Sequence, residues 1–510
     1  MKRLTRNRLF FSNLGSILGL LSLTLRADQV RISIDCANPG VSISRNMLGL
    51  SYETSLMLPD SSGVHYFRPD NQPLINIFKT TGIKSLRIGG NSVDAPKVPI
   101  PTESDIRSFF EFARAAGVKV IYSVRLEEST NSGALPPSNA ESAGKIAKLI
   151  HDHYSNVLDC FAIGNEPDYF RGQNYAVYPS KWKAIRDAIL AVYPQATFAG
   201  PDQNPSPVLS RQMVHEFGDG SGRLVMVTQH TYPFGCSYKN PNERSDIGKL
   251  VPLDAAASRE KMLSPAAYRT YQNIYKGIAD AIAGTSISYR LTECNSFWFS
   301  GLKGASDSYA SALWAVDFLN WWASHGADGL NFHTGDRTGG DLSMDCRYAA
   351  FVTSRQGYEA RPLAYGMKLF DLAGHGKRLN TAVGSATNFI AYACLDNDSV
   401  SVTLLNTSHG PEAKDRAVEI DVDVPLLSSN AEILFLRSRN DDVSGGPADV
   451  TLGGAPIKED GSWNGQWTQL PSAAATGNRL TLTMPPASAA VVKFSVHHSL
   501  RNSPASSRVE

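Results

Sequence analysis

The sequence predicts a (β/α)8 barrel followed by an antiparallel β-sandwich. Eight short apolar runs alternate with helix-like segments between residues 46 and 375, and short β-type runs separated by polar turns fill residues 376–497. No Gly-x-Gly-x-x-Gly motif follows the first run. Its absence removes the main dinucleotide-binding alternative, an open doubly wound sheet.

The eight apolar runs are the expected barrel strands. Several are continuously apolar, as in residues 118–124, which is typical of parallel strands buried on both faces. Gly117 marks the end of the helix before that run. The strands are expected at Met47–Glu53, Lys84–Gly90, Val118–Arg125, Leu158–Asn165, Thr197–Pro201, Leu224–His230, Ser288–Glu293 and Gly329–His333. The helices are expected at Thr102–Ala116, Asn139–Tyr154, Ser180–Tyr193, Pro265–Ala283 and Ser306–Ser324.

The β-rich region after the barrel contains six runs rich in Val, Ile, Thr and Phe, separated by Asn, Asp, Gly and Ser. Residues Val30–Asp35 alternate in the same way, so the segment 28–45 is expected to add a strand to the sandwich. Residues 498–510 lack a core pattern and read as a tail. The six runs are Asn388–Cys394, Ser399–Asn406, Val418–Val422, Ala431–Arg437, Arg479–Met484 and Ala490–Val496.

The N-terminal segment has the pattern of a secretory signal. Lys2 and Arg3 begin a basic stretch before the apolar residues Leu14–Leu25, and the small residue Ala27 follows. The apolar stretch is shorter than the roughly 20 residues that span a bilayer. We therefore expect residues 1–27 to be a signal peptide and the product to be secreted or periplasmic, without membrane contact after processing. An uncleaved anchor is the alternative, because Arg26 makes a poor cleavage site.

Composition excludes several classes of partner. Lys and Arg number 49 against 48 Asp and Glu, and this balance gives no electrostatic reason to bind nucleic acid or an acidic membrane. The six cysteines form no C-x-x-C pair and have no His at zinc spacing, so no structural metal site is expected. Their even number permits disulfides without indicating a pairing. Cys160 and Cys294 lie in expected strands and are interpreted as small buried apolar residues.

Two glutamates end strands on opposite sides of the expected barrel. Glu166 follows the fourth strand within Gly164-Asn-Glu-Pro167, and Glu293 ends the seventh. Carboxyl ends of strands four and seven can direct both side chains at one point, as glycoside hydrolysis by an acid and a second carboxylate requires. A single glutamate at a strand end is more simply a solvated rim residue. The pair on these two strands favours catalysis.

These motifs resemble a known group of enzymes. The strand-four Asn-Glu-Pro and strand-seven glutamate resemble the retaining glycosidases of clan A, and the chain looks most like glycoside hydrolase family 79, the β-glucuronidase and heparanase group. The resemblance covers about residues 30–497, roughly the barrel and the sandwich. Its supporting motifs are Leu48-Gly-Leu-Ser-Tyr-Glu53, Leu86-Arg-Ile-Gly-Gly-Asn91, Gln229-His-Thr-Tyr232 and Leu291-Thr-Glu293.

The resemblance implies roles around the carboxylate pair. Glu166 would be the general acid and base, and Glu293 the nucleophile, whose charge would keep Glu166 protonated for the first step. Asn165 would hydrogen-bond the sugar 2-hydroxyl, and Tyr232 would orient Glu293. Arg87 would lie beneath the pair; the alternative is a buried charge that only closes the barrel core.

The resemblance also implies sugar-binding residues. Glu53, Gly90 and Asn91 would bind hydroxyl groups, with a rim position as the alternative for Glu53. After strand eight, Tyr348 and nearby Arg347 are the candidates for reading a uronate carboxylate, although the loop departs from the simpler Gly-x-Tyr pattern expected there. For both residues the alternative is a side chain that faces solvent.

The predicted function is an exported, retaining β-glucuronidase or related uronidase that works without metal or cofactor on a uronide-containing glycan or glycoside. A clan A enzyme acting on a neutral xyloside, glucoside or arabinofuranoside is the first alternative, and a non-catalytic carbohydrate-binding protein is the second. Exo or endo action and oligomeric state are left open. The near-zero net charge favours a small uronide over a long sulfated polymer.

Overall fold

The computed structural model describes most of the chain. The predicted signal segment 1–27 and the tail 498–510 lie outside the described residues, as do parts of the two long loops after the sixth and eighth barrel strands. The described residues are 29–126, 138–167, 178–204, 207–218, 220–239, 250–264, 268–336, 345–384, 386–426 and 430–496.

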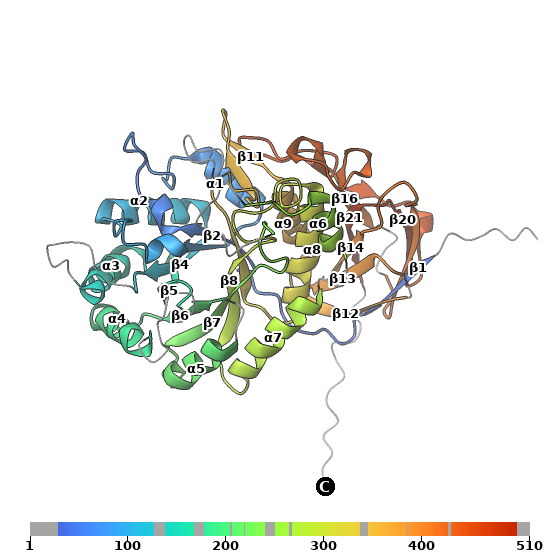
Figure 1. The fold of residues 1–510 in the computed structure, drawn as a ribbon. Helices are drawn as coiled ribbons and strands as arrows, with labels where there is room; N and C mark the ends of the chain where they lie inside the picture. Colours follow the sequence, from blue (N-terminus) through green and yellow to red (C-terminus); the bar gives the residue numbers. More distant parts are fainter. Residues whose placement is uncertain are drawn as a thin grey trace, which may run out of the picture.

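Eight parallel strands close into a barrel in chain order, which confirms the predicted fold class (Figure 1). Their interior and exterior faces are both buried, because the outer helices cover one side and strand side chains fill the other. The fifth barrel strand continues past Pro201 to Gln203, further than its apolar run indicates. The strands are β2 (Leu48–Glu53), β3 (Ser85–Gly89), β4 (Lys119–Val124), β5 (Leu158–Ile163), β6 (Phe198–Gln203), β7 (Leu224–Thr231), β8 (Ser288–Cys294) and β9 (Gly329–His333).

All five predicted helices are present, and the structure adds four that the sequence pattern missed: α1, α5, α6 and α9. The second helix begins at a capping box in which Thr102 and Asp105 bond each other's backbone N–H groups, and it ends at Gly117 with a φ of 74°. The helices are α1 (Gln72–Thr80), α2 (Glu103–Ala116), α3 (Asn139–Tyr154), α4 (Tyr178–Val192), α5 (Pro207–Phe217), α6 (Ala255–Met262), α7 (Tyr268–Ile282), α8 (Tyr309–Ser324) and α9 (Pro362–Ala373).

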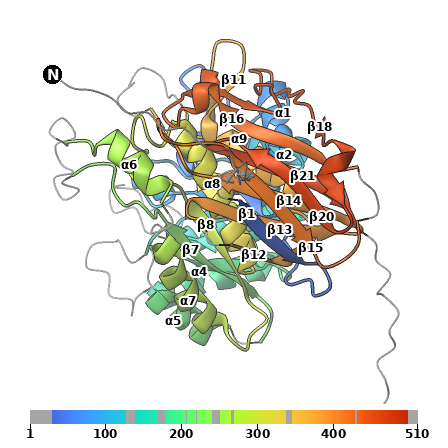
Figure 2. The ribbon, with the colours of Figure 1, turned by 90° about the vertical axis from the view of Figure 1, so that its right-hand side faces the viewer.

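The β domain is one 11-stranded sheet curled into two layers around its own apolar core. Its N-terminal strand, β1 (Val30–Asp35), lies among strands from the end of the chain, pairing antiparallel with β12 and parallel with β15 (Figure 2). The sheet is therefore not wholly antiparallel. The remaining strands are β12 (Lys377–Val383), β13 (Phe389–Asp396), β14 (Ser399–Asn406), β15 (Arg416–Val422), β16 (Glu432–Ser438), β17 (Val450–Leu452), β18 (Thr468–Gln469), β19 (Ala475–Thr476), β20 (Arg479–Met484) and β21 (Ser488–Ser495).

The barrel and the β domain share a buried joint. Helix α8 is buried almost all round, because it packs on the barrel on one side and on β14 and β21 on the other. Polar groups lie inside this joint: Tyr392 donates to the Asp317 carboxylate at 2.8 Å, and Arg378 donates to the Asn320 side-chain oxygen at 3.1 Å. The two parts are thus held together by packing and by a few hydrogen bonds.

The two long connections are partly ordered into regular structure. The connection after β7 contains α6, and the one after β9 contains a hairpin of β10 (Phe351–Thr353) and β11 (Tyr358–Ala360). Residues 240–249 and 337–344 within them lie outside the described part, including most of the predicted uronate loop. The six cysteines, all in described segments, form no disulfide bond, and Cys160 and Cys294 are buried as predicted.

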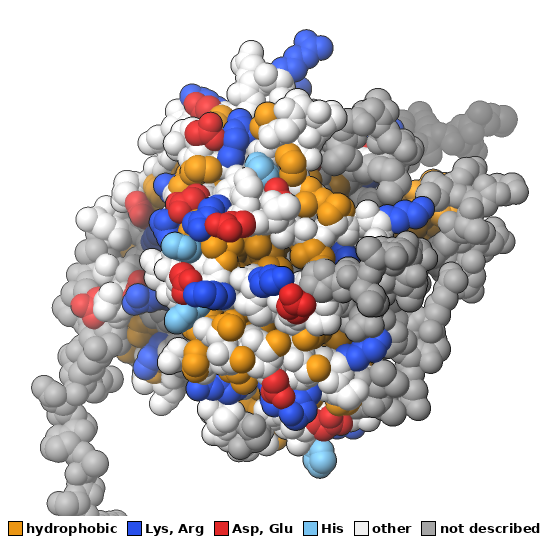
Figure 3. Space-filling model, turned by 90° about the vertical axis from the view of Figure 1, so that its left-hand side faces the viewer, with side chains coloured by type: hydrophobic (Ala, Val, Ile, Leu, Met, Phe, Trp, Pro, Cys, Tyr) orange, Lys and Arg blue, Asp and Glu red, His pale blue; other side chains and the backbone are white. Residues whose placement is uncertain are grey.

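Acidic and basic side chains are interspersed on the face formed by α2, α3 and α4, with no large area of one sign (Figure 3). Many of them form pairs one helical turn apart, such as Lys145 with Glu141 at 2.7 Å. Within the described segments, no helix has the length and apolarity required to cross a bilayer.

Candidate active site

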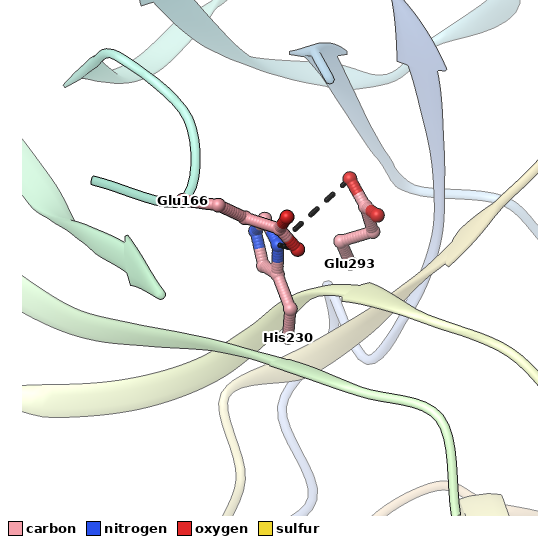
Figure 4. A group of neighbouring side chains, drawn as sticks. All are labelled: Glu166, His230 and Glu293. Atoms are coloured by element: carbon pink, nitrogen blue, oxygen red, sulfur yellow. Dashed lines mark hydrogen bonds and ion pairs between the residues drawn. The ribbon is translucent and has the colours of Figure 1, made fainter. Parts of the chain in front are cut away.

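The carboxyl ends of β5 and β8 bring the two predicted glutamates face to face. Glu166 lies three residues after β5 ends, and Glu293 is the penultimate residue of β8. An oxygen of one carboxylate lies within 4.8 Å of an oxygen of the other, with the His230 side chain beside Glu166 (Figure 4). This spacing is close to the roughly 5–5.5 Å that separates the carboxyl groups of retaining glycosidases.

Glu293 is held as a buried carboxylate. Tyr232 donates to its Oε1 at 2.8 Å and Arg87 donates to its Oε2 at 2.8 Å, and the residue is only 7% exposed. Burial alone would raise the pKa of this carboxyl. The positive potential of His333, His230 and Arg87, with the Tyr232 hydrogen bond, outweighs burial and holds its pKa far below the usual range. Glu293 is therefore ionised at neutral pH, as a nucleophile needs to be.

Glu166 lies in a different environment. Its Oε1 is 2.9 Å from Nδ1 of His230, and its side chain remains partly exposed. Its backbone has a φ of 45°, in the left-handed region, and its N–H donates to the carbonyl of Asp202, whose own φ is 54°. Such conformations cost about 1–3 kcal/mol each and persist where the surroundings fix them. The strained backbone places the carboxyl group above the barrel mouth.

Arg87 links the whole cluster from below. The guanidinium is fully buried; besides Glu293 it donates to the Asn165 side-chain oxygen at 2.7 Å, to Asp202 at 2.9 Å and to the Ser51 hydroxyl at 3.0 Å. Burial opposes its charge, but the carboxylates of Asp202 and Glu293 outweigh that effect and raise the pKa of Arg87. Arg87 is placed to fix both the nucleophile and the residue next to Glu166.

Asn165 is oriented at both ends. Its Oδ1 accepts from Arg87, and its Nδ2 donates to the Oδ1 of Asn91 at 3.1 Å. Its backbone N–H donates to Asp94 at 2.9 Å, and the same carboxylate accepts the N–H of Leu126 at 2.7 Å. Asp94 therefore ties the segment before Glu166 to the segments that follow β3 and β4.

Glu53 is bound by the turn after β3. Its Oε2 accepts from the N–H of Ser92 at 2.7 Å and from the hydroxyl of Ser92 at 2.5 Å, and its Oε1 accepts from the N–H of Asn91 at 3.2 Å. Gly90 has a φ of 66°, and a Cβ there would lie 2.5 Å from the Glu53 carboxylate. Burial opposes ionisation, but His333 and Ser92 lower the pKa of Glu53. Only glycine fits this turn against the carboxylate.

Tyr348 and Arg347, the two residues predicted to bind a uronate carboxylate, lie in different environments. Tyr348 is buried, with its ring centroid 6.1 Å from that of Tyr232 and 6.1 Å from that of His333, so it forms part of the wall of the site. Arg347 is partly exposed, and its guanidinium forms an ion pair with Asp345 at 2.6 Å. Tyr348 is thus next to the carboxylate pair, whereas Arg347 already has an anionic partner.

Several residues of the site are absent from the sequence-based prediction, and Asp202, His230 and His333 are those that contact the carboxylates or Arg87 as ionisable groups. His230 lies within the Gln229–Tyr232 motif, where only the tyrosine was singled out. His333 ends the eighth strand, and the position at a strand end was the available signal for it. Asp202 follows a proline that read as the end of its strand.

The described residues contain one group of ligand-type side chains that converge, Glu166, His230 and Glu293, with their atoms within 4.8 Å of one another. Both oxygens of Glu293 already accept hydrogen bonds, from Tyr232 and from Arg87. A divalent cation would have to displace these donors and sit beside a guanidinium. The donor set fits a hydrogen-bonded carboxylate pair better than a metal centre.

The architecture defined here, a closed barrel with a curled β domain beside it, is shared with solved glycoside hydrolases. The 4-O-α-L-rhamnosyl-β-D-glucuronidase of Fusarium oxysporum superposes with a TM-score of 0.64 at 16% identity over 91% of this chain and 100% of that chain. A glycoside hydrolase family 51 arabinofuranosidase of Xanthomonas axonopodis pv. citri gives 0.63 at 14% identity, over 92% and 100%. The family 39 enzyme of that organism gives 0.60 at 13% identity, over 92% and 97%.

The sequence match covers less of the chain than the structural matches do. A β-glucuronidase of Aspergillus niger is 23% identical in an alignment 309 positions long that covers 52% of this chain and 53% of the relative. The match therefore spans about half the length of that relative. No protein-family model matches the chain.

Proposed function

We propose that the protein is a retaining glycoside hydrolase of clan A, similar to family 79, that removes terminal β-linked glucuronic acid. The observation that carries the proposal is the facing pair of carboxylates, one held ionised by Arg87 and Tyr232 and the other hydrogen-bonded to a histidine. The similarity to the Aspergillus β-glucuronidase supports the choice of sugar. A lectin would have no use for a proton donor opposite an ionised nucleophile.

In the first step, Glu293 attacks the anomeric carbon while Glu166 protonates the departing oxygen. Attack by an ionised carboxylate requires no prior proton transfer from Glu293. The hydrogen bond from Tyr232 and the guanidinium of Arg87 leave the geometry of the nucleophile fixed before the sugar arrives.

In the second step, Glu166 acts as the base that activates water. Once Glu293 carries the sugar it has lost its charge, so Glu166 no longer faces an anion. His230 can follow this change: its Nδ1, 2.9 Å from Glu166, accepts a hydrogen bond when the carboxyl is protonated and donates one when it is ionised. A single contact therefore serves both protonation states of Glu166.

The sugar would be held by groups around the carboxylate pair. Asn165 reaches the 2-hydroxyl, and Glu53 and Asn91 reach hydroxyls further round the ring. Tyr348 is the candidate donor to the uronate carboxylate, with Arg347 beside it. Arg347 would contribute by exchanging part of its ion pair with Asp345 for the substrate.

A panel of aryl glycosides tests the proposal: the β-glucuronide against the glucoside, galactoside, xyloside and arabinofuranoside. The glucuronide is expected to be cleaved with the highest kcat/KM. Cleavage of a neutral glycoside without cleavage of the glucuronide would overturn the uronidase assignment and leave the reaction class intact. If none of these glycosides is cleaved, the result contradicts the proposal that the protein is a glycosidase.

A neutral sugar is the second candidate, and the Arg347–Asp345 ion pair favours it, because that pair leaves the described part of the site without an uncommitted guanidinium. The fold similarity to an arabinofuranosidase supports the same alternative. The variant Asp345→Asn removes the anionic partner of Arg347 and thereby distinguishes the two candidate substrates. It should improve cleavage of the glucuronide if Arg347 binds the uronate, and leave a neutral glycoside unaffected.

Glu293→Ala should abolish turnover, lowering kcat by at least roughly a thousandfold, because the covalent step is lost. Added azide should restore cleavage with inversion at the anomeric carbon, since a small anion can occupy the space of the missing carboxylate. Thermal unfolding measured by circular dichroism serves as the control for folding. Activity within tenfold of the wild type would rule out the nucleophile role.

Glu166→Ala should slow cleavage of natural glycosides by about 10²–10⁴-fold, since general acid catalysis is lost. Activated aryl glycosides, whose leaving groups need no proton, should retain much more of their rate of bond cleavage in single-turnover measurements. An equal loss on both kinds of substrate would contradict the acid role of Glu166.

Export by the N-terminal segment completes the proposal, supported by the basic residues before Leu14–Leu25. Expression of the full chain followed by N-terminal sequencing of the protein in the medium or periplasm tests it. Retention of the intact N-terminus in the membrane fraction would indicate the anchored form instead.

A further inference from the structure

His333, the last residue of β9, lies between two carboxylates of the site. Its Nε2 is 3.6 Å from Oε1 of Glu53, and its Nδ1 is 3.6 Å from Oε2 of Glu293. The residue is 8% exposed, so these distances span little or no bulk water. The proposed mechanism assigns this imidazole no task, yet it bridges the nucleophile and a predicted sugar ligand.

The contacts of His333 accommodate both of its protonation states. Nδ1 lies 3.2 Å from the hydroxyl of Ser51, and that oxygen also accepts from Arg87 at 3.0 Å. When the imidazole carries two protons, Nδ1–H can donate to Ser51. When it carries one, on Nε2, the Ser51 hydroxyl can donate to Nδ1. The site can therefore lose or gain this proton without leaving a buried polar atom unpaired.

The charges around His333 favour its protonated form. Burial lowers the pKa of the imidazole, but Glu293 and Glu53 together outweigh burial, and the pKa is raised although Arg87 opposes the added charge. The ionisable groups that face it are Glu53 from β2, Arg87 from β3, Glu293 from β8 and Tyr348 from the loop after β9, with His230 of β7 on the far side of Glu293.

We propose that His333, in its protonated form, is a positioning residue that holds Glu53 and Glu293 in place around the sugar, and that loss of its proton weakens substrate binding as pH rises. This inference rests on the proposed glycosidase function. Oε2 of Glu53 accepts two hydrogen bonds from Ser92, whereas Oε1 accepts one, from the N–H of Asn91 at 3.2 Å, and can accept another from a sugar hydroxyl. His333 faces Oε1. With a neutral imidazole, Glu53 and Glu293 face each other with less charge between them.

The test compares three variants on an activated aryl glycoside, whose cleavage does not need the proton of Glu166. His333→Gln keeps a donor near Glu53 without the charge, and His333→Ala removes both. His409→Gln is the matched control, because His409 also contacts a glutamate, Glu260 at 2.8 Å, on the groove between α6 and the β domain. Thermal unfolding of all three reports on folding.

In the wild type and in His409→Gln, KM should increase as pH rises through the pKa of His333. In His333→Gln and His333→Ala, KM should already be about ten- to hundredfold higher at pH 6, as expected for a lost charge-assisted contact, and should vary less with pH. The change should fall mainly on KM. The inference is wrong if His333→Gln keeps the KM and the pH profile of the wild type.

Histidine titration by NMR tests the bridge without turnover. With ¹³C-labelled histidine, the signal that disappears in His333→Gln or His333→Ala should titrate above about 6.5, the ordinary value, and Glu53→Gln should move its pKa downward. A His333 pKa at or below 6.5, with glycosides still cleaved, would overturn the inference and leave the proposed function standing. No cleavage of any glycoside would overturn the function, whatever His333 does.

If both His333 variants fail to fold, the wild type and Glu53→Gln still decide the question. One histidine signal should then shift its pKa between these two proteins while the others stay in place. Titration curves that coincide for every histidine would contradict the bridge.

Discussion

Among the described residues of the barrel, Arg87 and Arg290 are fully buried, and the comparison between them separates the site from the scaffold. Arg87, on β3, donates to the carboxylates of Glu293 and Asp202. Two of its four side-chain partners are carboxylates, and one of these is the candidate nucleophile. The charge of Arg87 is therefore used to set the charge of its neighbours.

Arg290, on β8, lies toward the amino ends of the strands and donates mainly to neutral oxygens. It bonds the side-chain oxygen of Asn331 at 2.8 Å, the carbonyl of Asp328 at 3.0 Å and the carbonyl of Asn46. The Asp328 carboxylate is also near, at 3.5 Å, but is 32% exposed. These contacts join β2, β8 and β9 where the barrel closes.

The difference shows how one residue type serves two ends of a barrel. Toward the carboxyl ends the guanidinium stabilises negative charge that the proposed chemistry needs, and toward the amino ends it ties backbone segments together. Burial alone does not distinguish the two roles. The chemistry of the acceptors does.

Arg87→Met should give the largest effect. It leaves Glu293 and Asp202 buried with less positive charge, which should cost about 3–5 kcal/mol of stability and raise the pKa of Glu293. We expect kcat/KM to fall by about a thousandfold, measured at a temperature where the variant is folded. Arg87→Lys keeps the positive charge but loses the planar guanidinium, so its kcat/KM should lie between those of the wild type and Arg87→Met. Activity near the wild-type level would assign Arg87 to the scaffold.

Asp317 extends the comparison to a buried carboxyl that bonds a tyrosine and no cation. Burial raises its pKa to about 7, which the hydrogen bond from Tyr392 only partly offsets. Because this pKa is above that of the unfolded chain, the folded state loses stability as pH rises from about 4 to 7. Asp317→Asn should remove that loss.

Relative to the wild type, Asp317→Asn should therefore gain up to about 4 kcal/mol of unfolding free energy between pH 4 and pH 8. Denaturant titrations at several pH values measure this difference. Asp187→Asn, on the exposed face of α4, is the control, and its unfolding free energy should vary with pH as that of the wild type does. If the unfolding free energy of Asp317→Asn varies with pH in the same way as that of the wild type, the Asp317 carboxyl does not titrate with a raised pKa in the folded protein.

Arg290→Met should have the smallest effect on catalysis. It leaves neutral acceptors unpaired, at about 1–3 kcal/mol for each buried group that finds no water, so Tm should fall. The kcat/KM of the folded enzyme should stay within about twofold of the wild type. Thermal unfolding and initial rates on the same samples measure both. A large loss of kcat/KM at unchanged Tm would show that Arg290 affects the active site as Arg87 does, and would contradict its assignment to the scaffold.

Local sequence patterns were enough to predict the barrel, because a buried parallel strand is recorded as a continuous apolar run. Helix α9 was missed for the opposite reason: it is buried between the barrel and the β domain, so its apolar residues show no single face. Strand β12 pairs first with β13 and then with β1, an exchange that no local pattern records.

Motifs and strand ends were enough to single out Glu166, Glu293 and Arg87, and in the structure the two glutamates face each other while Arg87 contacts Glu293. A residue's role was not predictable where it depends on a partner distant in the chain. His333, for example, acquires its environment from Glu53, 280 positions earlier in the chain. Only the folded barrel brings such partners together.

The position of β1 has a consequence for synthesis of the chain. Its partners β12 and β15 begin at residues 377 and 416, so Val30, Ile32 and Ile34 leave the ribosome long before anything can cover them. At about 5–20 residues per second, this strand stays unpaired for roughly 20–70 seconds while the barrel is made. The β domain can close only after the barrel has been translated, so β1 waits longer for its partners than any other described strand of this domain.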